Sequence, residues 1–162
     1  MIKASAIVQA RINSTRFPKK ILKPIYKNLN SLDLIQLRLG KCLNLERIIF
    51  AVPETDLELI EYLENKNYEY FTGSEKDVRD RYLKTAEFYS IENIVRITSD
   101  CPLVDPSLVD KCIMKFEKYQ YVSNNTPPTK SDYANGSDVE VLSKSSLYNS
   151  AKNFLNNKDK EH

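Results

Sequence analysis

Residues 3–22, KASAIVQARINSTRFPKKIL, join a short apolar segment directly to a strongly basic one. Residues 4–9 are small and apolar, which predicts a buried strand. The loop after this segment contains no acidic residue, and its cations are Arg11, Arg16, Lys19, Lys20 and Lys23. The hydroxyls of Ser14 and Thr15 lie between the two arginines. Arginine offers forked donors to phosphate oxygens and lysine offers a mobile charge, so the loop is typical of a triphosphate site.

This basic loop differs from the common glycine-rich phosphate loops. It contains no glycine, so it is neither a Walker loop nor a dinucleotide fingerprint. Side chains and a few turn amides would therefore hold a phosphate. The alternative is a solvated charged turn, which is the usual environment of Lys and Arg. The direct link to an apolar strand, and the hydroxyls between the cations, favour the phosphate interpretation.

The composition indicates one globular domain and excludes several classes of protein. The 162 residues are 41% hydrophobic and 28% charged, values typical of soluble proteins. A net charge of only +2 argues against a nucleic-acid partner, and no apolar run or leader indicates a membrane partner. The three cysteines lack metal-site spacing and the sole histidine is His162, which argues against zinc. We therefore expect a protein of the reducing cytoplasm.

Strand-like and helix-like segments alternate along the chain. The predicted strands are 4–9, 47–52, 68–71, 94–98, 121–122 and 139–142. The predicted helices are 31–43 with Ser31 as a possible cap, one begun by a Thr55/Glu58 capping box, 76–89, one begun by Asp105-Pro106, and 145–156. Such repeated units predict an α/β three-layer fold with a largely parallel sheet. Its ligands would bind at the carboxyl ends of the strands, where loops 10–23, 72–77, 98–105 and 124–138 should gather.

A carboxylate follows the predicted strand 94–98. Asp100 is well placed there to bind Mg²⁺, which favours one or two protein carboxylates together with phosphates. The alternative is that Asp100 caps a turn. Cys101 is next to it, but the chain has no histidine nearby in sequence to activate a thiol, so a cysteine nucleophile is rejected.

Two further segments are candidate ligand contacts. Gly73 could let the backbone approach a ligand closely, whereas spacing alone favours Ser74 and Asp77 as caps of the following helix. The stretch 124–137 is long enough to contact a substrate, the alternative being a connector.

Taken together, these segments resemble a known family. The motifs IVQARINSTRFPKKILKPI, FTGSEKDVRDRY, IVRITSDCPLVDPSLVD and YVSNN…PP…GSDVEVLS occur in order from residue 3 to about residue 147. They resemble the cytidylyltransferases that activate acidic sugars, within the acylneuraminate cytidylyltransferase group and nearest to the spore-coat polysaccharide biosynthesis protein F type. The resemblance implies a Rossmann-like nucleotide-diphospho-sugar transferase fold with a seven-stranded mixed sheet when complete. It also implies a reaction of CTP with a nonulosonate-like sugar acid that releases pyrophosphate and uses Mg²⁺.

The resemblance also assigns roles by position. The residues implied to contact the nucleotide are Gln9, Ala10, Arg11, Ser14, Arg16, Lys20, Ser74 and Arg81, the last two near the base. Asp100 would be the metal ligand, and Asn124 and Asp138 would face the acceptor sugar. The catalytic set would be Arg11, Lys20 and Asp100.

The sequence departs from the family pattern in three places. Lys19 and Ser99 stand where related sequences usually have glycine. The chain also ends at His162, where the family continues with a dimer arm, a last strand and a second metal-binding aspartate. We therefore expect a single domain incomplete at its C-terminus, from a family whose full-length members form homodimers.

Two other functions remain open from the sequence. One is a nucleotide-binding module with little activity. The other is a glycosyltransferase that uses a finished nucleotide sugar, a chemistry that the same fold hosts. The sequence around Asp100 lacks the Asp-x-Asp pair usual in such transferases, which makes this the weaker alternative.

Overall fold

The computed structural model describes residues 2–13, 17–125, 133–134 and 136–153. Its strands are β1 (Ala4–Gln9), β2 (Leu45–Pro53), β3 (Tyr70–Gly73), β4 (Asn93–Thr98), β5 (Tyr121–Ser123) and β6 (Glu140–Ser143). Its α-helices are α1 (Ser31–Leu39), α2 (Leu57–Asn65), α3 (Val78–Phe88), α4 (Pro106–Phe116) and α5 (Lys144–Asn153), with a short 3₁₀-helix η1 (Lys20–Leu22). Ser14 and Arg16, both predicted site residues, lie outside the described residues.

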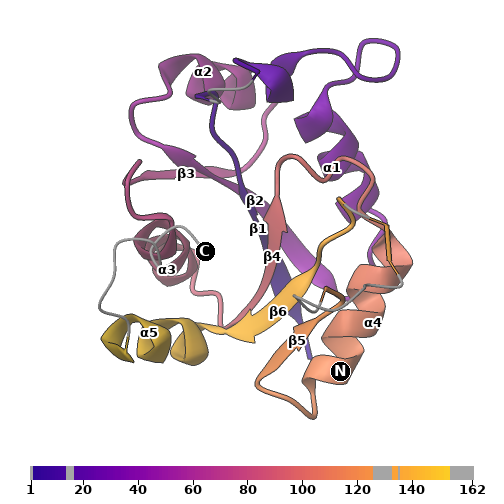
Figure 1. Cartoon of the computed structure of the whole chain (residues 1–162), viewed down its shortest axis with the longest axis vertical. Coiled ribbons are helices and arrows are strands. Elements are labelled where there is room, and N and C mark those ends of the chain that lie inside the picture. Colours follow the sequence, from indigo (N-terminus) through magenta and orange to yellow (C-terminus); the bar gives the residue numbers. More distant parts are fainter. Residues whose placement is uncertain (1, 14–16, 126–132, 135, 154–162) are drawn as a thin grey trace.

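The strands form one mixed sheet in the order β3-β2-β1-β4-β6-β5 (Figure 1). Strands β1 to β4 pair in parallel, whereas β6 is antiparallel to both of its neighbours. The chain therefore has the expected α/β fold with a mostly parallel sheet. Because β5 is antiparallel to β6, it runs in the same direction as β4, so the carboxyl ends of β1, β3, β4 and β5 share one edge.

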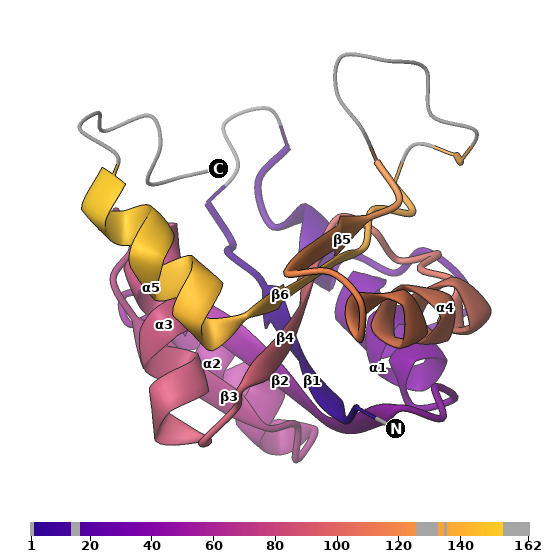
Figure 2. The same cartoon turned by 90° about the horizontal axis from the view of Figure 1, so that it is seen from below.

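Helices cover both faces of the sheet (Figure 2). Alternate residues of β1 point to opposite faces, as in any strand. Ala6 and Val8 join a core cluster with residues of α1, α2 and α4. Ile7 joins a second cluster, which contains residues of α3 and packs against Leu147 of α5. The apolar residues of this strand are thus buried on both faces of the sheet, as is usual for parallel strands.

Helix α1 begins differently from the prediction. Asn30, not Ser31, is the N-cap, and its side chain accepts a hydrogen bond from the backbone N–H of Asp33. The Asp33 side chain accepts in return from the backbone N–H of Asn30, which completes a capping box. The hydroxyl of Ser31 instead donates to the backbone carbonyl of Ser99, and so ties α1 to the loop after β4.

The predicted Thr55/Glu58 capping box is wrong. Helix α2 begins after Asp56, and the Thr55 hydroxyl donates to Glu75 instead. The box fails because Thr55 is used by a residue distant in the sequence. The predicted caps at Asp105 and Asp77 are confirmed, since each carboxylate accepts from a backbone N–H of the helix that follows it.

Candidate functional site

The candidate site lies where β1 and β4 end side by side. Gln9 is paired in register with Thr98, and the backbone N–H of Ser99 donates to the carbonyl of Gln9 at 2.9 Å. On the other side, the N–H of Ala10 donates to the carbonyl of Ala51 at 3.1 Å, and Ala10 is buried. The sheet thus holds the chain one residue beyond β1 before the basic loop departs.

A buried carboxylate then fixes the start of the basic loop. Asp56 is 6% exposed, and its Oδ2 accepts a hydrogen bond from the backbone N–H of Ile12 at 2.8 Å. The carbonyl of Ile12 accepts from the N–H of Lys19 at 3.2 Å, which joins the two ends of the loop. The sequence analysis missed Asp56 because its partner is 44 residues away. Near Asp56 in the sequence, the one feature that could have indicated a role was its position just before a helix.

The C-terminal end of the basic loop contains a backbone conformation that favours glycine. Lys19 has φ 57° and ψ 21°, in the left-handed region, where a Cβ atom is costly. This agrees with the resemblance, in which glycine is common at this position. The Lys19 ammonium forms an ion pair with Glu58 at 2.5 Å, so it points to α2.

The next residue, Lys20, meets the predicted metal ligand. Its Nζ lies 3.4 Å from Oδ2 of Asp100, and both side chains are partly exposed. Burial raises the pKa of Asp100, but the Thr98 hydroxyl and the charge of Lys20 outweigh it, so the net pKa is below its ordinary value. The tertiary structure therefore brings two predicted catalytic residues, 80 positions apart, into contact at the sheet edge.

The donor groups at this edge suit Mg²⁺ better than they suit a metal ion whose ligands all come from the protein. Asp100 supplies one partly exposed carboxylate that is ionised at neutral pH. Within the described part of the chain, no three His, Cys, Asp or Glu residues gather around a common point. Mg²⁺ usually binds one or two carboxylates and takes its other ligands from water and phosphates. This donor set suits an ion shared with a bound phosphate.

Arg81 is the most unusual side chain near the edge. It is 1% exposed, and Nη1 donates to the carbonyl of Ser74. Its Nε and Nη2 are buried and have no hydrogen-bond partner among the described residues. Burial lowers its pKa, and the nearby charge of Arg11 lowers it further. Buried donors are almost always paired in proteins, so a water or a ligand acceptor would satisfy these two nitrogens.

Gly73 makes room for this arginine. A Cβ atom at Gly73 would lie 3.1 Å from Cγ of Arg81, which is tighter than ordinary contact. The close approach expected at Gly73 is therefore made by a side chain of the protein itself. The hydroxyl of Ser74 accepts from the N–H of Asp77 at 3.1 Å, so Ser74 helps to begin α3, as its spacing indicated.

The two residues expected to face the acceptor sugar lie in the loop between β5 and β6. The side chain of Asn124 donates to the carbonyl of Ser137 at 2.8 Å and accepts from the N–H of Val139 at 2.7 Å. Asn124 therefore fastens the two ends of this loop together. Asp138 accepts from the Asn125 amide at 3.1 Å.

Asp138 also lies near the Asp100 side of the sheet edge. Burial raises the pKa of the Cys101 thiol, and the charges of Asp100 and Asp138 contribute in the same direction. A thiol with a raised pKa is a poor nucleophile, which agrees with its rejection from the sequence. The charge of Asp138 is thus close enough to influence the pKa of Cys101, the residue that follows Asp100.

Comparison with known families identifies the chain. The family model for cytidylyltransferases matches residues 5–161. The chain belongs to the cytidylyltransferase family. The match confirms the resemblance that the four motifs indicated. Separately, no helix in the described residues is long and apolar enough to cross a membrane.

Curated relatives of this cytidylyltransferase come from bacteria and an archaeon. It is 33% identical over 165 residues to the uncharacterized protein MJ1063 of Methanocaldococcus jannaschii, covering 99% of this chain and 65% of the relative. It is 34% identical over 128 residues to the spore coat polysaccharide biosynthesis protein SpsF of Bacillus subtilis, covering 73% and 53%. A 3-deoxy-manno-octulosonate cytidylyltransferase of Koribacter versatilis is 27% identical, covering 87% and 54%. The chain thus spans about half to two thirds of the length of these relatives.

Solved structures agree with the fold. A cytidylyltransferase from Leptospira borgpetersenii serovar Hardjo-bovis has a TM-score of 0.89 and 30% identity, covering 100% of this chain and 69% of that one. A CMP:2-keto-3-deoxy-manno-octonic acid synthetase complexed with CTP has a TM-score of 0.75 over 95% of this chain and 79% of its own. Its identity is 11%, so it supports the fold alone.

Proposed function

We propose that this cytidylyltransferase binds CTP at the sheet edge and transfers CMP to an acidic, nonulosonate-like sugar with release of pyrophosphate. The observation that carries the proposal is Arg81, whose Nε and Nη2 are buried without a partner in the described structure, beside the loop that contains Arg11. The relatives include a polysaccharide biosynthesis protein and a sugar-acid cytidylyltransferase, which supports a role in surface polysaccharide or glycan synthesis.

Arg81 offers a physical reason for the choice of cytosine. Cytosine presents two adjacent acceptors, O2 and N3, whereas the N3 of uracil carries a proton and is a donor. The two unpaired nitrogens of Arg81, Nε with one N–H and Nη2 with two, could donate to both acceptors of cytosine and would oppose the donor of uracil. A site built around buried donors rejects a ligand that leaves them unpaired, because the full cost of the lost hydrogen bonds remains.

The charged residues would stabilise the departing pyrophosphate. A hydroxyl oxygen of the acceptor sugar attacks the α-phosphorus and loses its proton to water. The bond from that phosphorus to the bridging oxygen of the β-phosphate breaks with its electron pair on pyrophosphate. Arg11 and Lys20 would neutralise the charge that develops there. No covalent enzyme intermediate is required, so the protein acts by positioning and electrostatics.

Asp100 is the residue that would hold Mg²⁺. The ion, when bound, would neutralise phosphate charge and polarise the α-phosphate. Lys20 lies 3.4 Å from the same carboxylate, so Asp100 and Lys20 together present a negative and a positive group to one phosphate chain.

Calorimetric titration with CTP, UTP, ATP and GTP in the presence of Mg²⁺ tests the proposal. We expect CTP to bind at least tenfold more tightly than UTP. A sugar acid should then release pyrophosphate from bound CTP, measured with a coupled phosphate assay. A folded protein that binds none of the four nucleotides would contradict the proposal.

A further inference from the structure

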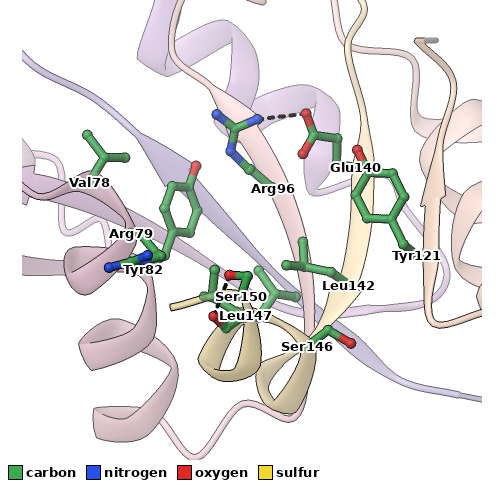
Figure 3. Close-up of a pocket in the computed structure, with 11 residues that line it drawn as sticks. Val78, Arg79, Tyr82, Arg96, Tyr121, Glu140, Leu142, Ser146, Leu147 and Ser150 are labelled. Atoms are coloured by element: carbon green, nitrogen blue, oxygen red, sulfur yellow. Dashed lines mark hydrogen bonds and ion pairs between the residues drawn. The ribbon is translucent and has the colours of Figure 1, made fainter. Parts of the chain in front are cut away.

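A separate pocket of about 270 Å³ lies on the face of the sheet covered by α3 and α5 (Figure 3). Residues of α3, β4, β5, β6 and α5 line it. Its volume is below the usual range of sites for larger ligands, so it suits a molecule of about one monosaccharide. None of the residues assigned to the nucleotide lines this pocket.

The polar centre of the pocket is an arginine–glutamate pair. Nη1 of Arg96 lies 2.7 Å from Oε1 of Glu140, and the side chains are 23% and 27% exposed (Figure 3). Burial lowers the pKa of Arg96, but its interactions with Tyr82 and with the Glu140 carboxylate raise it more, so the guanidinium stays charged. A guanidinium has five N–H donors, and the Glu140 contact uses one of its nitrogens. The rest can form the forked contact that suits a carboxylate.

Arg96 and Glu140 are register partners on β4 and β6, so a cross-strand ion pair also accounts for their contact. Partly buried ion pairs contribute little net stability, because the cost of desolvation offsets the attraction. The pair also lies at a pocket with a second arginine, Arg79, whose Nη1 is buried without a hydrogen-bond partner in the described structure. Two guanidiniums and one carboxylate leave the pocket with an excess of positive charge, which favours an anion.

The remaining lining suits a sugar. Leu142 and Leu147 supply apolar surface, and Ser146 and Ser150 supply hydroxyls on the α5 side (Figure 3). Sugars combine hydroxyl groups with apolar C–H faces, so a mixed wall of this kind matches them. The carboxylate of Glu140 can accept hydrogen bonds from such hydroxyls.

The pocket is also adjacent to the nucleotide edge. Arg96 and Thr98 lie on the same face of β4, two residues and therefore about 7 Å apart. Thr98 in turn hydrogen-bonds to Asp100, the predicted metal ligand. On α3, Tyr82 lines the pocket, and it directly follows Arg81, the residue proposed to contact the base. A molecule in the pocket would therefore lie beside the phosphates at Asp100.

We infer that this pocket is the acceptor subsite, in which Arg96 binds the carboxylate of the sugar acid and Glu140 binds its hydroxyls. The inference rests on the proposed function and goes beyond it by giving a role to two residues, Arg96 and Glu140, that lie within the motifs but had no role assigned from the sequence. It separates the site into a nucleotide part at β1 and an acid-binding part at β4 and β6.

Binding of two sugar acids and their neutral esters tests the inference. Affinities for 3-deoxy-manno-octulosonate, N-acetylneuraminate and the methyl ester of each are measured by calorimetry with CMP present, which prevents turnover. The test variant is Arg96→Gln/Glu140→Gln, which removes both charges and retains hydrogen-bonding groups. The matched control is Lys84→Gln, which removes one charge from the exposed side of α3. CTP affinity is measured for every protein.

We expect the wild-type chain to bind at least one acid ten or more times more tightly than its ester. The double variant should lose this preference and bind the acid at least tenfold more weakly, with its CTP affinity unchanged within twofold. Lys84→Gln should match the wild type. If the double variant fails to fold, Arg96→Lys is used, and the loss of its forked donors should lower the preference at least fivefold.

An acid affinity that is equal in the wild type and the variant overturns the inference, as does a wild-type chain that binds CTP but neither acid. In both cases the nucleotide assignment stands. A wild-type chain that fails to bind CTP overturns the proposed function itself, together with the subsite that depends on it.

Discussion

Asp56 accepts a buried hydrogen bond from the backbone N–H of Ile12, with Oδ2 2.8 Å from the nitrogen. This contact joins the residue before α2 to the first turn of the basic loop. It fixes where the loop leaves the sheet, and thus the position of Arg11 beside it. The carboxylate of Asp56 thus binds the loop backbone, although every charged side chain of the loop itself is positive.

We predict that Asp56→Ala weakens both folding and CTP binding. The substitution leaves the Ile12 N–H buried and unpaired, which costs about 1–3 kcal/mol of unfolding free energy. The loop also loses its anchor, so CTP affinity should fall at least tenfold. Asp56→Asn is the control, because its amide oxygen can still accept, and it should retain most of the affinity. Urea denaturation and calorimetry measure the two effects, and equal behaviour of both variants would show that the hydrogen bond is unimportant.

We predict that Lys20→Ala lowers turnover by about 100-fold or more, the scale for loss of a positioned donor to a developing anion. Lys20 contacts Asp100 and lies where the triphosphate is proposed to bind. The matched control is Lys111→Ala, which removes a charge from an exposed position on α4. Pyrophosphate release under saturating CTP and sugar acid is the measurement. Near-wild-type turnover of Lys20→Ala would remove this residue from the catalytic set.

Acidification should destabilise the chain through Asp33. Burial raises the pKa of Asp33, but four hydrogen bonds lower it more, so the net pKa is below its ordinary value. The donors are Tyr62, the Asn30 backbone, Tyr68 and Lys66. A group whose folded-state pKa is depressed adds stability above its unfolded pKa and loses it as the pH falls through the folded one. The difference in unfolding free energy between wild type and Asp33→Asn should therefore shrink as the pH falls below about 4. Urea denaturation at pH 7, 5, 4 and 3 checks this, and a difference that is constant with pH would contradict it.

The left-handed backbone at Lys19 predicts an unusual effect of glycine. Lys19→Gly and Lys19→Ala both remove the ion pair with Glu58, but only glycine relieves the strain of a Cβ atom at φ 57°. The glycine variant should therefore be more stable than the alanine variant by about 1 kcal/mol. Thermal and urea unfolding of the pair measure the difference. An alanine variant at least as stable as the glycine variant would show that this conformation is not strained.

Local sequence determined the elements and some of their ends. The apolar run 4–9 became β1, and Asp105-Pro106 began α4 as predicted. These features depend on residues within a few positions of one another, so propensity and capping chemistry are enough to predict them. The same reasoning failed at Thr55 and Ser31, whose hydroxyls are used by partners 20 and 68 residues away.

The motifs allowed one contact of the candidate site to be expected for a similar reason. Each one follows a strand, and parallel strands bring their carboxyl ends to one edge, so the meeting of Lys20 with Asp100 could be expected. No feature of the sequence indicated the burial of Arg81, because that burial depends on how α3 packs and on the space left by Gly73.

By itself, the sequence determined the strand and helix segments, the basic loop and the family. Only the tertiary structure decided which distant residues became partners: Ile12 with Asp56, and Arg96 with Glu140. The second pair exists because β6 lies between β4 and β5 and is antiparallel to both. Strand order and register arise from the packing of the whole core, and each strand alone is compatible with several neighbours. The pocket built around that pair is therefore a property of the assembled sheet.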